Sequence, residues 1–516
     1  MSDILAKTLS FGVSGVNGFP VQIEVFAPGG IPGMDIIGLP DASVRESRNR
    51  VSAAIINSGE DLPARRITIN LAPADMKKEG PSFDLPIAVG IMIALHDFTP
   101  VPEIDLSDVA LFGELSLDGS IQPINGALPM VISAKENGNS RVILPEKNAR
   151  EVSCIQDIQI LPVSHLRQVI DWLKGLGDIP KQRQISFEEL KNEAVISTDM
   201  AQIRGQKGAR RGIEVAAAGG HNMLMIGVPG SGQTMLARCI PGILPPMSFE
   251  ESLETTRIHS ICGRLPSGSG LMVTRPFCAP HHNASVASLI GGGQDAKPGE
   301  VSMAHNGVLF LDELPEFSRS ALEALRQPLE DGIVSVARVK KQAQYQSSFM
   351  LVAAMNPCPC GYFGSTRRTC RCTPPEIRKY LDRVSGPLLD RIDLQIEVDS
   401  VPVSEINSDE PAESSAAVAE RVRKARMIQL ERYRGTGKHC NAQLSNTEVK
   451  RYCTPDPEAV RLLNAAVDTL HLSMRAYQRI LKVARTIADL DNEQTISSAH
   501  VAEAIQYREL DQKYWR

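Results

Sequence analysis

The sequence GVPGSGQT at residues 227–234 decides the fold of this 516-residue chain. It follows the apolar stretch 223–226 and precedes a helix-forming stretch. Phosphate-binding loops of the pattern G-x-x-x-x-G-K-[ST] lie between a strand and a helix, where glycines let main-chain N–H groups face a phosphate. The dipole of the following helix adds to this attraction. We expect a nucleotide-binding loop whose contact residues are Gly227, Gly230, Ser231, Gly232, Gln233, Thr234 and Met235.

One position of this loop departs from the pattern, because Gln233 stands where lysine is usual. The lysine ammonium contacts the β- and γ-phosphates and offsets charge in the transition state. A glutamine amide donates hydrogen bonds but carries no charge. We therefore expect nucleotide binding to survive, with Thr234 as a magnesium ligand, and hydrolysis to weaken. A glycine-rich turn without a ligand is the alternative, which the motifs described next disfavour.

Two short apolar runs further along end in polar residues. Residues 308–311 are followed by Asp312 and Glu313, as in a Walker B strand. We expect Asp312 to hold magnesium and Glu313 to orient or deprotonate the attacking water. Asn356 follows the run 349–355 and suits contact with the γ-phosphate or with that water. Strands that alternate with helices in this way predict a parallel sheet.

Two arginines near the carboxyl end fit roles at the γ-phosphate. Arg391, in the sequence LDRID, is a candidate arginine finger, and Arg475 opens a helix from which it could sense the γ-phosphate. Surface ion pairs would explain either arginine alone, but the ordered set of motifs favours the nucleotide. Arg475 is also a candidate to replace the charge that Gln233 lacks.

Length and composition exclude several classes of protein. A chain of 516 residues predicts three or four domains, and 42% hydrophobic with 22% charged residues excludes disorder. The net charge of −5, from 55 basic and 60 acidic residues, excludes a wholly basic coat but permits a local basic surface. The apolar stretch 86–95 is too short to cross a bilayer, and the amino terminus lacks a signal-peptide pattern. We expect a cytoplasmic protein with no membrane partner.

Four of the ten cysteines form the pattern C-x-C-x9-C-x-C, at Cys358, Cys360, Cys370 and Cys372. In a reducing compartment, thiols serve metals or cores instead of disulfides. Four thiols that converge from a short loop predict a tetrahedral structural zinc site. Four free cysteines in a loop are the alternative.

Longer motifs extend the pattern over nearly the whole chain. They are APHHNASVASLIGGG from Ala279, KPGEVSMAHNGVLFLDELPEF from Lys297, MNPCPCGY from Met355, SGPLLDRIDL from Ser385 and MRAYQRILKVARTIADL from Met474. This ordered set resembles the AAA+ ATPases, in the branch with the magnesium-chelatase subunits and the MCM helicases. The more specific resemblance is to the ComM/YifB family of magnesium chelatase-like proteins.

The amino-terminal motifs GLPDASVRESRNRV from Gly38 and KKEGPSFDLPIAVG from Lys77 resemble the same family, whose first domain is similar to the Lon protease domain. Lon-type peptidases use a Ser–Lys dyad. Ser82 matches the nucleophile segment, but Leu128 matches the lysine position, and Lys135 lies beyond it. We therefore expect a non-peptidase platform for oligomer packing or DNA contact.

The resemblance implies an α/β multidomain fold. The expected parts are a Lon-protease-like α+β domain at 1–175, a linker at 176–199, an AAA+ P-loop αβα core with chelatase-type and MCM-type insertions at 200–398, an acidic linker at 399–418, and a helical lid at 419–516. The core includes the cysteine loop at 358–372.

The resemblance also implies a function. ComM/YifB proteins are hexameric DNA motors that use ATP and magnesium and promote branch migration in homologous recombination during natural transformation. ATP would lie between subunits of the ring, with Arg391 supplied by the neighbour. Single-stranded or branched DNA is the implied partner. A pore hairpin of the MCM-like branch places Arg338, Lys340 and Lys341 as candidate phosphate contacts, with a solvated basic face as the alternative.

Three other functions remain open. A chelatase-type ATPase for metal insertion shares the nucleotide motifs, but the Lon-like domain and the cysteines favour ComM/YifB. A nucleotide-binding scaffold with little hydrolysis fits Gln233, and Leu128 disfavours an ATP-dependent protease. His281 and His282 could ligate a metal, although a structural role in the insertion loop is favoured.

Overall fold

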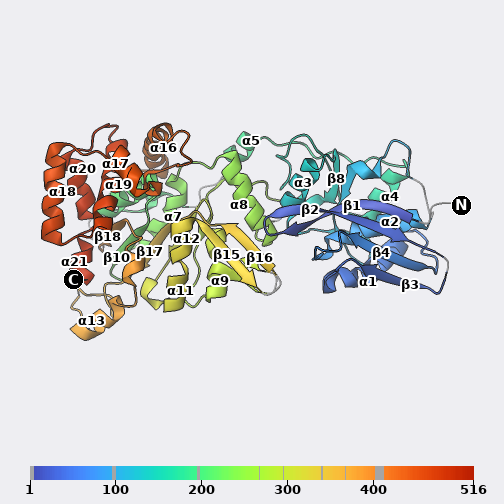
Figure 1. Ribbon diagram of the computed structural model, residues 1–516, viewed down its shortest axis with the longest axis horizontal. Helices are drawn as coiled ribbons and strands as arrows, with labels where there is room; N and C mark the ends of the chain where they lie inside the picture. The colour runs from blue at the N-terminus through green and yellow to red at the C-terminus, as the bar shows by residue number, and fades with distance from the viewer. Residues whose placement is uncertain are drawn as a thin grey trace. The chain divides into compact units, whose positions relative to one another are not determined.

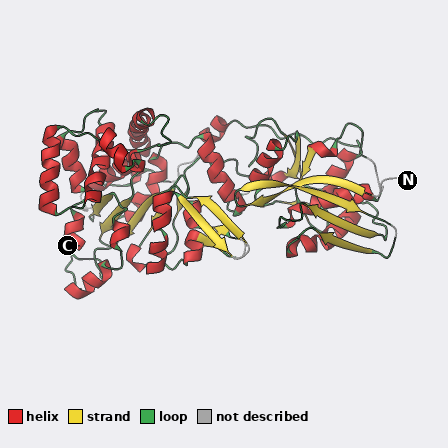
Figure 2. Cartoon of the chain, viewed as in Figure 1, coloured by secondary structure: helices red, strands yellow, loops and turns green. Residues whose placement is uncertain are grey.

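The computed structural model describes residues 5–28, 30–95, 100–193, 198–266, 268–293, 296–338, 341–365, 368–400 and 412–515. Its contacts group the chain into two units, both of which combine helices with strands (Figures 1 and 2). Unit 1 comprises Met1–Glu193 and Ser248–Val273, and unit 2 comprises Ala194–Met247 and Thr274–Arg516. No helix in the described part of the chain is long and apolar enough to cross a membrane.

Unit 1 contains a seven-stranded mixed sheet. Its strand order is β3 (Gly33–Ile37), β4 (Arg66–Ala72), β2 (Asn17–Phe26), β1 (Leu5–Ser14), β5 (Val109–Leu111), β8 (Arg141–Pro145) and β9 (Gln159–Val163). Strand β2 is antiparallel to both of its neighbours. Its residues Phe19, Val21, Ile23 and Val25 are buried because side chains two positions apart share one face.

Helices complete this unit. They are α1 (Ala42–Asn57), α2 (Asp84–Ala94), α3 (Ala127–Glu136), α4 (Leu166–Leu173), α5 (Phe187–Asn192) and α8 (Phe249–Ile261), with the short pair β6 (Glu114–Leu115) and β7 (Ile121–Gln122). Helix α8 belongs to unit 1 although the chain on both sides of it belongs to unit 2. The hydroxyl of Ser260 on α8 donates to buried Glu151, which also accepts the N–H of Leu128 at 3.0 Å.

Unit 2 contains a five-stranded sheet in the order β11, β14, β17, β10 and β18, and all neighbouring pairs are parallel. The strands are β11 (Phe277–Cys278), β14 (Val308–Leu311), β17 (Met350–Met355), β10 (Met223–Gly227) and β18 (Leu394–Val398). Every residue of β10, β14 and β17 is buried. This arrangement confirms the expected parallel sheet and places the carboxyl ends of β10, β14 and β17 side by side.

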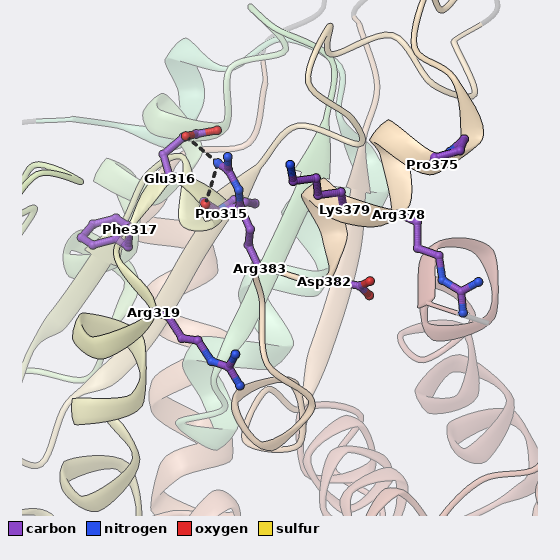
Figure 3. Close-up of a pocket in the computed structure, with 9 residues that line it drawn as sticks. All are labelled: Pro315, Glu316, Phe317, Arg319, Pro375, Arg378, Lys379, Asp382 and Arg383. Carbon is purple, nitrogen blue, oxygen red and sulfur yellow. Dashed lines mark hydrogen bonds and ion pairs between the residues drawn. The ribbon is translucent and has the colours of Figure 1, made fainter.

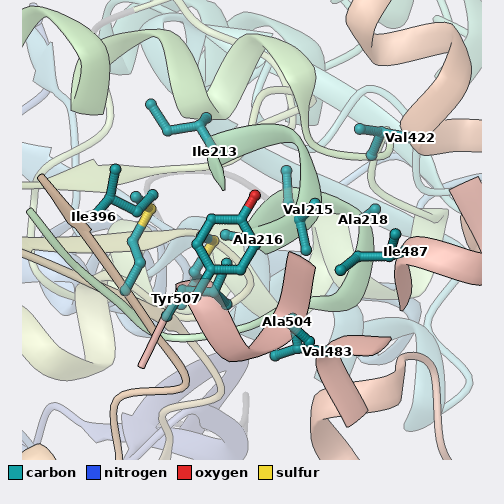
Figure 4. Close-up of a cluster of buried hydrophobic side chains, with 14 of the residues drawn as sticks. Ile213, Val215, Ala216, Ala218, Ile396, Val422, Val483, Ile487, Ala504 and Tyr507 are labelled. Carbon is teal, nitrogen blue, oxygen red and sulfur yellow. The ribbon is translucent and has the colours of Figure 1, made fainter. Parts of the chain in front are cut away.

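Helices pack around this sheet. The first of them are α6 (Lys207–Gly219), α7 (Gln233–Ile243), α9 (Val286–Ile290), α10 (Glu300–Met303), α11 (Arg319–Ala324), α12 (Arg326–Asp331), α13 (Pro374–Leu381) and α14 (Gly386–Leu389). The carboxyl-terminal ones are α16 (Ser415–Arg432), α17 (Asn446–Tyr452), α18 (Pro457–Leu470), α19 (Met474–Leu490), α20 (Ser498–Gln506) and α21 (Leu510–Trp515). Figure 4 shows their shared core, in which Ile213 and Val215 of α6 lie among apolar side chains of the sheet and of the carboxyl-terminal helices.

Two helices lie wholly or partly within the stretches that are expected to be linkers. Helix α5 lies inside the expected linker 176–199, and α16 begins inside the expected linker 399–418. The hydroxyl of Ser415 accepts a hydrogen bond from the N–H of Met200 at 2.8 Å, which anchors the start of α16. Residues 401–411 lie outside the described part of the chain.

Candidate nucleotide site

The loop between β10 and α7 has the backbone that a phosphate-binding loop requires. Gly230 and Gly232 have φ angles of 79° and 93°, a left-handed region that favours glycine. Gly227 is required by packing, because a Cβ atom there would lie 2.3 Å from the carbonyl oxygen of Val398. Helix α7 begins directly after the loop, at Gln233.

Thr234 and Asp312 meet at the carboxyl edge of the sheet. The hydroxyl of Thr234 donates a hydrogen bond to Asp312 Oδ2 at 2.9 Å. The second carboxylate oxygen of Asp312 accepts the N–H of Glu313 at 3.0 Å. Mg²⁺ prefers hydroxyl, carboxylate, phosphate and water oxygens in a small octahedral shell. The converging oxygens of Thr234 and Asp312 therefore fit the protein half of such a shell.

Glu313 has a partner that the sequence analysis did not identify. His282 Nδ1 lies 2.9 Å from Glu313 Oε2, and the rings of His281 and His282 are 4.1 Å apart. His282 follows β11, which pairs with β14, so the two chain segments leave the same edge of the sheet. The order of the strands across the sheet was the missing information.

The side chain of Gln233 points back toward the sheet. Its Nε2 donates to the carbonyl oxygens of Met225 and Met355, each at 3.2 Å. Met225 is on β10 and Met355 ends β17, so the amide ties the first turn of α7 to both strands. In this conformation the amide hydrogens of Gln233 are directed to the main chain.

Asn356 lies at the end of β17, between the loop and the cysteine segment. Burial raises the pKa of Tyr380 on α13, and the nearby main chain of Asn356 opposes this shift. A Cβ atom at Gly361 would lie 2.5 Å from Pro229 Cγ and 3.8 Å from Asn356 Cγ. The cysteine segment therefore packs directly against the nucleotide loop.

The four cysteines converge. Cys358 Sγ lies 3.4 Å from Cys360 Sγ and 3.7 Å from Cys370 Sγ, and all four sulfurs, including that of Cys372, lie within 4.8 Å of one another. A tetrahedral zinc ion with bonds of about 2.3 Å holds its sulfurs roughly 3.8 Å apart. A hydrogen bond from the main chain of Arg371 lowers the pKa of Cys360 to about 6, and burial raises that of Cys358 to about 12. The donor set fits a structural metal.

Comparison with known proteins places these features in a family. The family described as magnesium chelatase, subunit ChlI, matches residues 199–406, and related descriptions match 23–148 and 412–508. The chain is 42% identical to YifB of Escherichia coli K12 over 500 residues, which cover 96% of each protein. It is 43% identical to the competence protein ComM of Haemophilus influenzae over 511 residues, 98% of each.

The chain belongs to the ComM/YifB family of magnesium chelatase-like AAA+ proteins. A further match is 33% identical to Lon protease 2 of Bacillus subtilis over 124 residues, which cover 24% of the chain and 21% of the protease. The expected family, the Lon-like amino-terminal region and the AAA+ core are thereby confirmed.

The Lon-like region of this ComM/YifB protein contains Ser82, which is buried in the turn Pro81–Phe83. Leu128 is also buried. Lys78 is buried too, and its ammonium donates to the carbonyl oxygens of Pro73 and Met76. The Lys78 ammonium is thus directed to main-chain oxygens, and Leu128 offers no amine at the position that matches the lysine of the dyad.

Arg391 and Arg475 each form an ion pair within the same chain. Arg391 pairs with Glu330 on α12, and its Nη1 donates to Pro387 O at 2.5 Å. Arg475 pairs with Asp390 at 3.3 Å. Burial, together with nearby arginines that include Arg475, lowers the pKa of Arg391. No described contact joins either arginine to the nucleotide loop of the same chain, and their roles at the γ-phosphate stay predictions.

The expected hairpin is present as β15 (Ile333–Arg338) and β16 (Lys341–Gln346), an antiparallel pair in which Arg338 faces Lys341 in register. The hydroxyl of Tyr345 donates to Ala296 O at 2.8 Å and fixes the base of the hairpin. Lys340, a predicted DNA contact, lies outside the described residues. The elements that complete this region are the short strands β12 (Gly291–Gly292) and β13 (Lys297–Pro298).

Proposed function

We propose that this chain is a cytoplasmic, ATP-dependent ring motor of the ComM/YifB type, which binds single-stranded or branched DNA. It promotes branch migration in homologous recombination during natural transformation. The observation that carries the proposal is the hydrogen bond between Thr234 and Asp312, with Glu313 held beside them by His282. The name of the Haemophilus influenzae relative, a competence protein, supports this role.

The nucleotide loop binds the phosphates of ATP through its main-chain N–H groups and the start of α7. Thr234 and Asp312 would hold Mg²⁺, and the ion would supply positive charge for the phosphates of ATP. Asn356 orients the γ-phosphate or the attacking water. Glu313 accepts the proton of that water as its oxygen attacks the γ-phosphorus, the bond from the γ-phosphorus to the bridging oxygen breaks, and ADP leaves.

Glu313 is restrained in the described conformation. Its carboxylate contacts His282 Nδ1 at 2.9 Å and must leave this partner to contact the water. Glu313 also has a φ angle of 52°, which is uncommon for a residue other than glycine. Release of Glu313 from His282 is thus a step at which a bound partner can control hydrolysis.

The remaining charge at the γ-phosphate comes from a neighbouring subunit. Arg391 extends from one chain toward the ATP of the next in a homo-hexamer, and Arg475 senses the γ-phosphate. The guanidinium of Arg391 has a buried Nε atom that no described residue accepts from. Arg391 must leave Glu330 and Pro387 to reach a ligand across a subunit interface.

The cysteine cluster holds a structural zinc ion. Because Gly361 of this segment packs on Pro229, the ion fixes the surface against which the nucleotide loop rests. The hairpin of β15 and β16 contacts DNA phosphates through Arg338, Lys340 and Lys341. Such contacts are independent of base sequence and weaken with salt.

A branch-migration assay tests this proposal. The full chain is mixed with ATP and a labelled three-stranded DNA junction, and strand release is followed with time. Release that requires ATP and is lost in Asp312→Asn is expected. Absence of strand release by both the parent and Gln233→Lys would reject the motor.

A nucleotide-binding scaffold is the second candidate, favoured by the contacts of Gln233 with Met225 and Met355. A scaffold would bind ATP and assemble with it, yet would hydrolyse it no faster in the presence of DNA. A chelatase-type ATPase for metal insertion shares the nucleotide site and would be insensitive to DNA.

A further inference from the structure

An open cleft of about 760 Å³ lies in unit 2 beside the nucleotide site (Figure 3). One wall is the turn Leu314–Glu316 with the start of α11, and the other is α13 with the residues after it. The turn directly follows the Walker B residues after β14, and α13 follows β17 and the cysteine segment. Both walls therefore arise from the edge of the sheet that carries the nucleotide loop.

The lining of the cleft is mainly cationic. Four basic residues, Arg319, Arg378, Lys379 and Arg383, face two acidic ones, Glu316 and Asp382. Arg383 pairs with Glu316 at 2.8 Å. In the described part of the chain, Arg319, Arg378 and Lys379 form no salt bridge. Three basic side chains thus remain available to an anion.

Helix α13 is fixed by a cap at its start and by a buried face. Thr373 and Glu376 form a capping box at its start, directly after Cys372. Ile377, Tyr380 and Leu381 are buried on one face. Arg378 and Lys379 therefore lie on the exposed face, as helical periodicity requires.

The shape of the cleft selects the kind of anion. A single small anion is held best in an enclosed site, whereas this cleft is wide and open and its cations are spread along both walls. Of the apolar lining residues, Pro375 is exposed, whereas Pro315 and Phe317 are buried. Cations spaced along an open cleft suit the successive phosphates of a phosphodiester backbone.

We propose that this cleft binds the phosphate backbone of single-stranded nucleic acid, as a contact separate from the β15–β16 hairpin. The inference rests on the proposed function and adds a second DNA-contacting surface to it. Because Tyr380 of α13 is buried and lies near the main chain of Asn356, a strand in the cleft lies one helix away from the hydrolysis site.

The test uses the full chain and a fluorescein-labelled 40-nucleotide oligothymidylate, with binding followed by fluorescence anisotropy between 50 and 200 mM salt. The variant is Arg378→Ala with Lys379→Ala. Two lost phosphate contacts should lower the slope of log K against log salt by about 1.4 and the affinity at low salt by roughly tenfold or more. The paired replacement Arg378→Lys with Lys379→Arg should keep the slope.

Matched controls distinguish the loss of the cleft cations from a general loss of positive charge and from misfolding. Arg423→Ala with Lys424→Ala removes two exposed cations from α16 and should leave binding nearly unchanged, since both lie near Glu420. Binding of a fluorescent ATP analogue should be equal in all variants, which verifies the fold of unit 2.

The outcomes distinguish the inference from the proposed function. DNA binding by the parent with an unchanged slope in the cleft variant overturns the inference alone. No DNA binding by the parent overturns both. If the cleft variant keeps its DNA affinity but fails to assemble with the ATP analogue in sedimentation velocity, the cleft contacts a second copy of the chain, and the inference is wrong.

Discussion

The side-chain amide of Gln233 donates a hydrogen bond to the main-chain carbonyl oxygen of Met355, 3.2 Å away at the end of β17. Its second contact, with Met225 O at the same distance, lies on β10. The residue that replaces the usual lysine is therefore part of the joint between the loop helix and two strands. The main-chain donors of the loop remain for the phosphates, while the cation that stabilises the transition state is missing.

The contact between His282 and Glu313 predicts that His282 slows ATP hydrolysis. In the Gln233→Lys background, His282→Ala should raise the basal rate several-fold, because Glu313 no longer has a partner to leave. Phosphate release without and with single-stranded DNA measures the effect. His281→Ala is the matched control and should change neither rate. If His282→Ala leaves the ratio of DNA-stimulated to basal rate unchanged, His282 does not inhibit hydrolysis.

The cysteine cluster predicts about one zinc ion per chain. Cys370→Ser should lower the zinc content to near zero and weaken nucleotide binding, because the segment that packs on Pro229 loses its support. Elemental analysis and the fluorescent ATP analogue measure the two effects. Cys262→Ser, outside the cluster, should retain zinc. Metal-free parent protein, prepared without chelator, would refute the zinc site.

Buried Glu151 predicts a pH-dependent stability of unit 1. Burial raises the pKa of Glu151 above its ordinary value of 4.5, so the folded state retains the proton to higher pH than the unfolded state. Its contribution to stability is present below pH 4.5 and is lost as pH rises through the folded pKa. Glu151→Gln should remove this loss, which has a slope on the order of 1 kcal/mol per pH unit.

Urea unfolding measures this difference in the full chain. Trp172 reports on unit 1 once Trp515 is replaced by Phe, since these are the two tryptophans of the sequence. The exposed Glu146 provides the matched control, and Glu146→Gln should follow the parent at every pH. Parallel pH profiles for the parent and Glu151→Gln would show that Glu151 does not titrate with unfolding.

The hairpin predicts a salt-dependent DNA contact. Reversal of charge at Lys340 and Lys341 should weaken the binding of single-stranded DNA and lower its salt slope, because phosphates are the target. Fluorescence anisotropy at several salt concentrations measures both. Replacement of the hairpin residue Gln344 by Glu adds one negative charge away from the turn and should have a smaller effect. Unchanged affinity in the lysine variant would show that these hairpin residues do not contact DNA.

The sequence was sufficient for the sheet of unit 2 and for the contact between Thr234 and Asp312. Buried strands of four to six apolar residues, each followed by a polar residue, are local signals, and parallel pairing then brings their ends together. Cys358 and its three partners were predictable for the same reason, because their spacing along the chain is short.

Contacts between distant segments were not predictable from local patterns. His282 reaches Glu313 only because β11 neighbours β14, and nothing in either motif specifies that order. Helix α8 follows the nucleotide loop in the sequence, yet Ser260 joins it to Glu151 of unit 1. The amide of Gln233 could be expected near phosphate from its position alone. Its contacts with main-chain carbonyl oxygens depend on the tertiary structure.

The central claim is that this chain is an ATP-driven DNA motor whose turnover is limited by Gln233. The direct measurement is ATP hydrolysis by the full chain, with and without single-stranded DNA, beside Gln233→Lys. We expect ATP to promote ring assembly in both, very low turnover with Gln233, and turnover higher by an order of magnitude or more with lysine, because the added cation stabilises the γ-phosphoryl transition state. Brisk DNA-stimulated hydrolysis by the chain with Gln233 would contradict the claim and would indicate that another basic residue, such as Arg475, supplies the charge in the assembled ring.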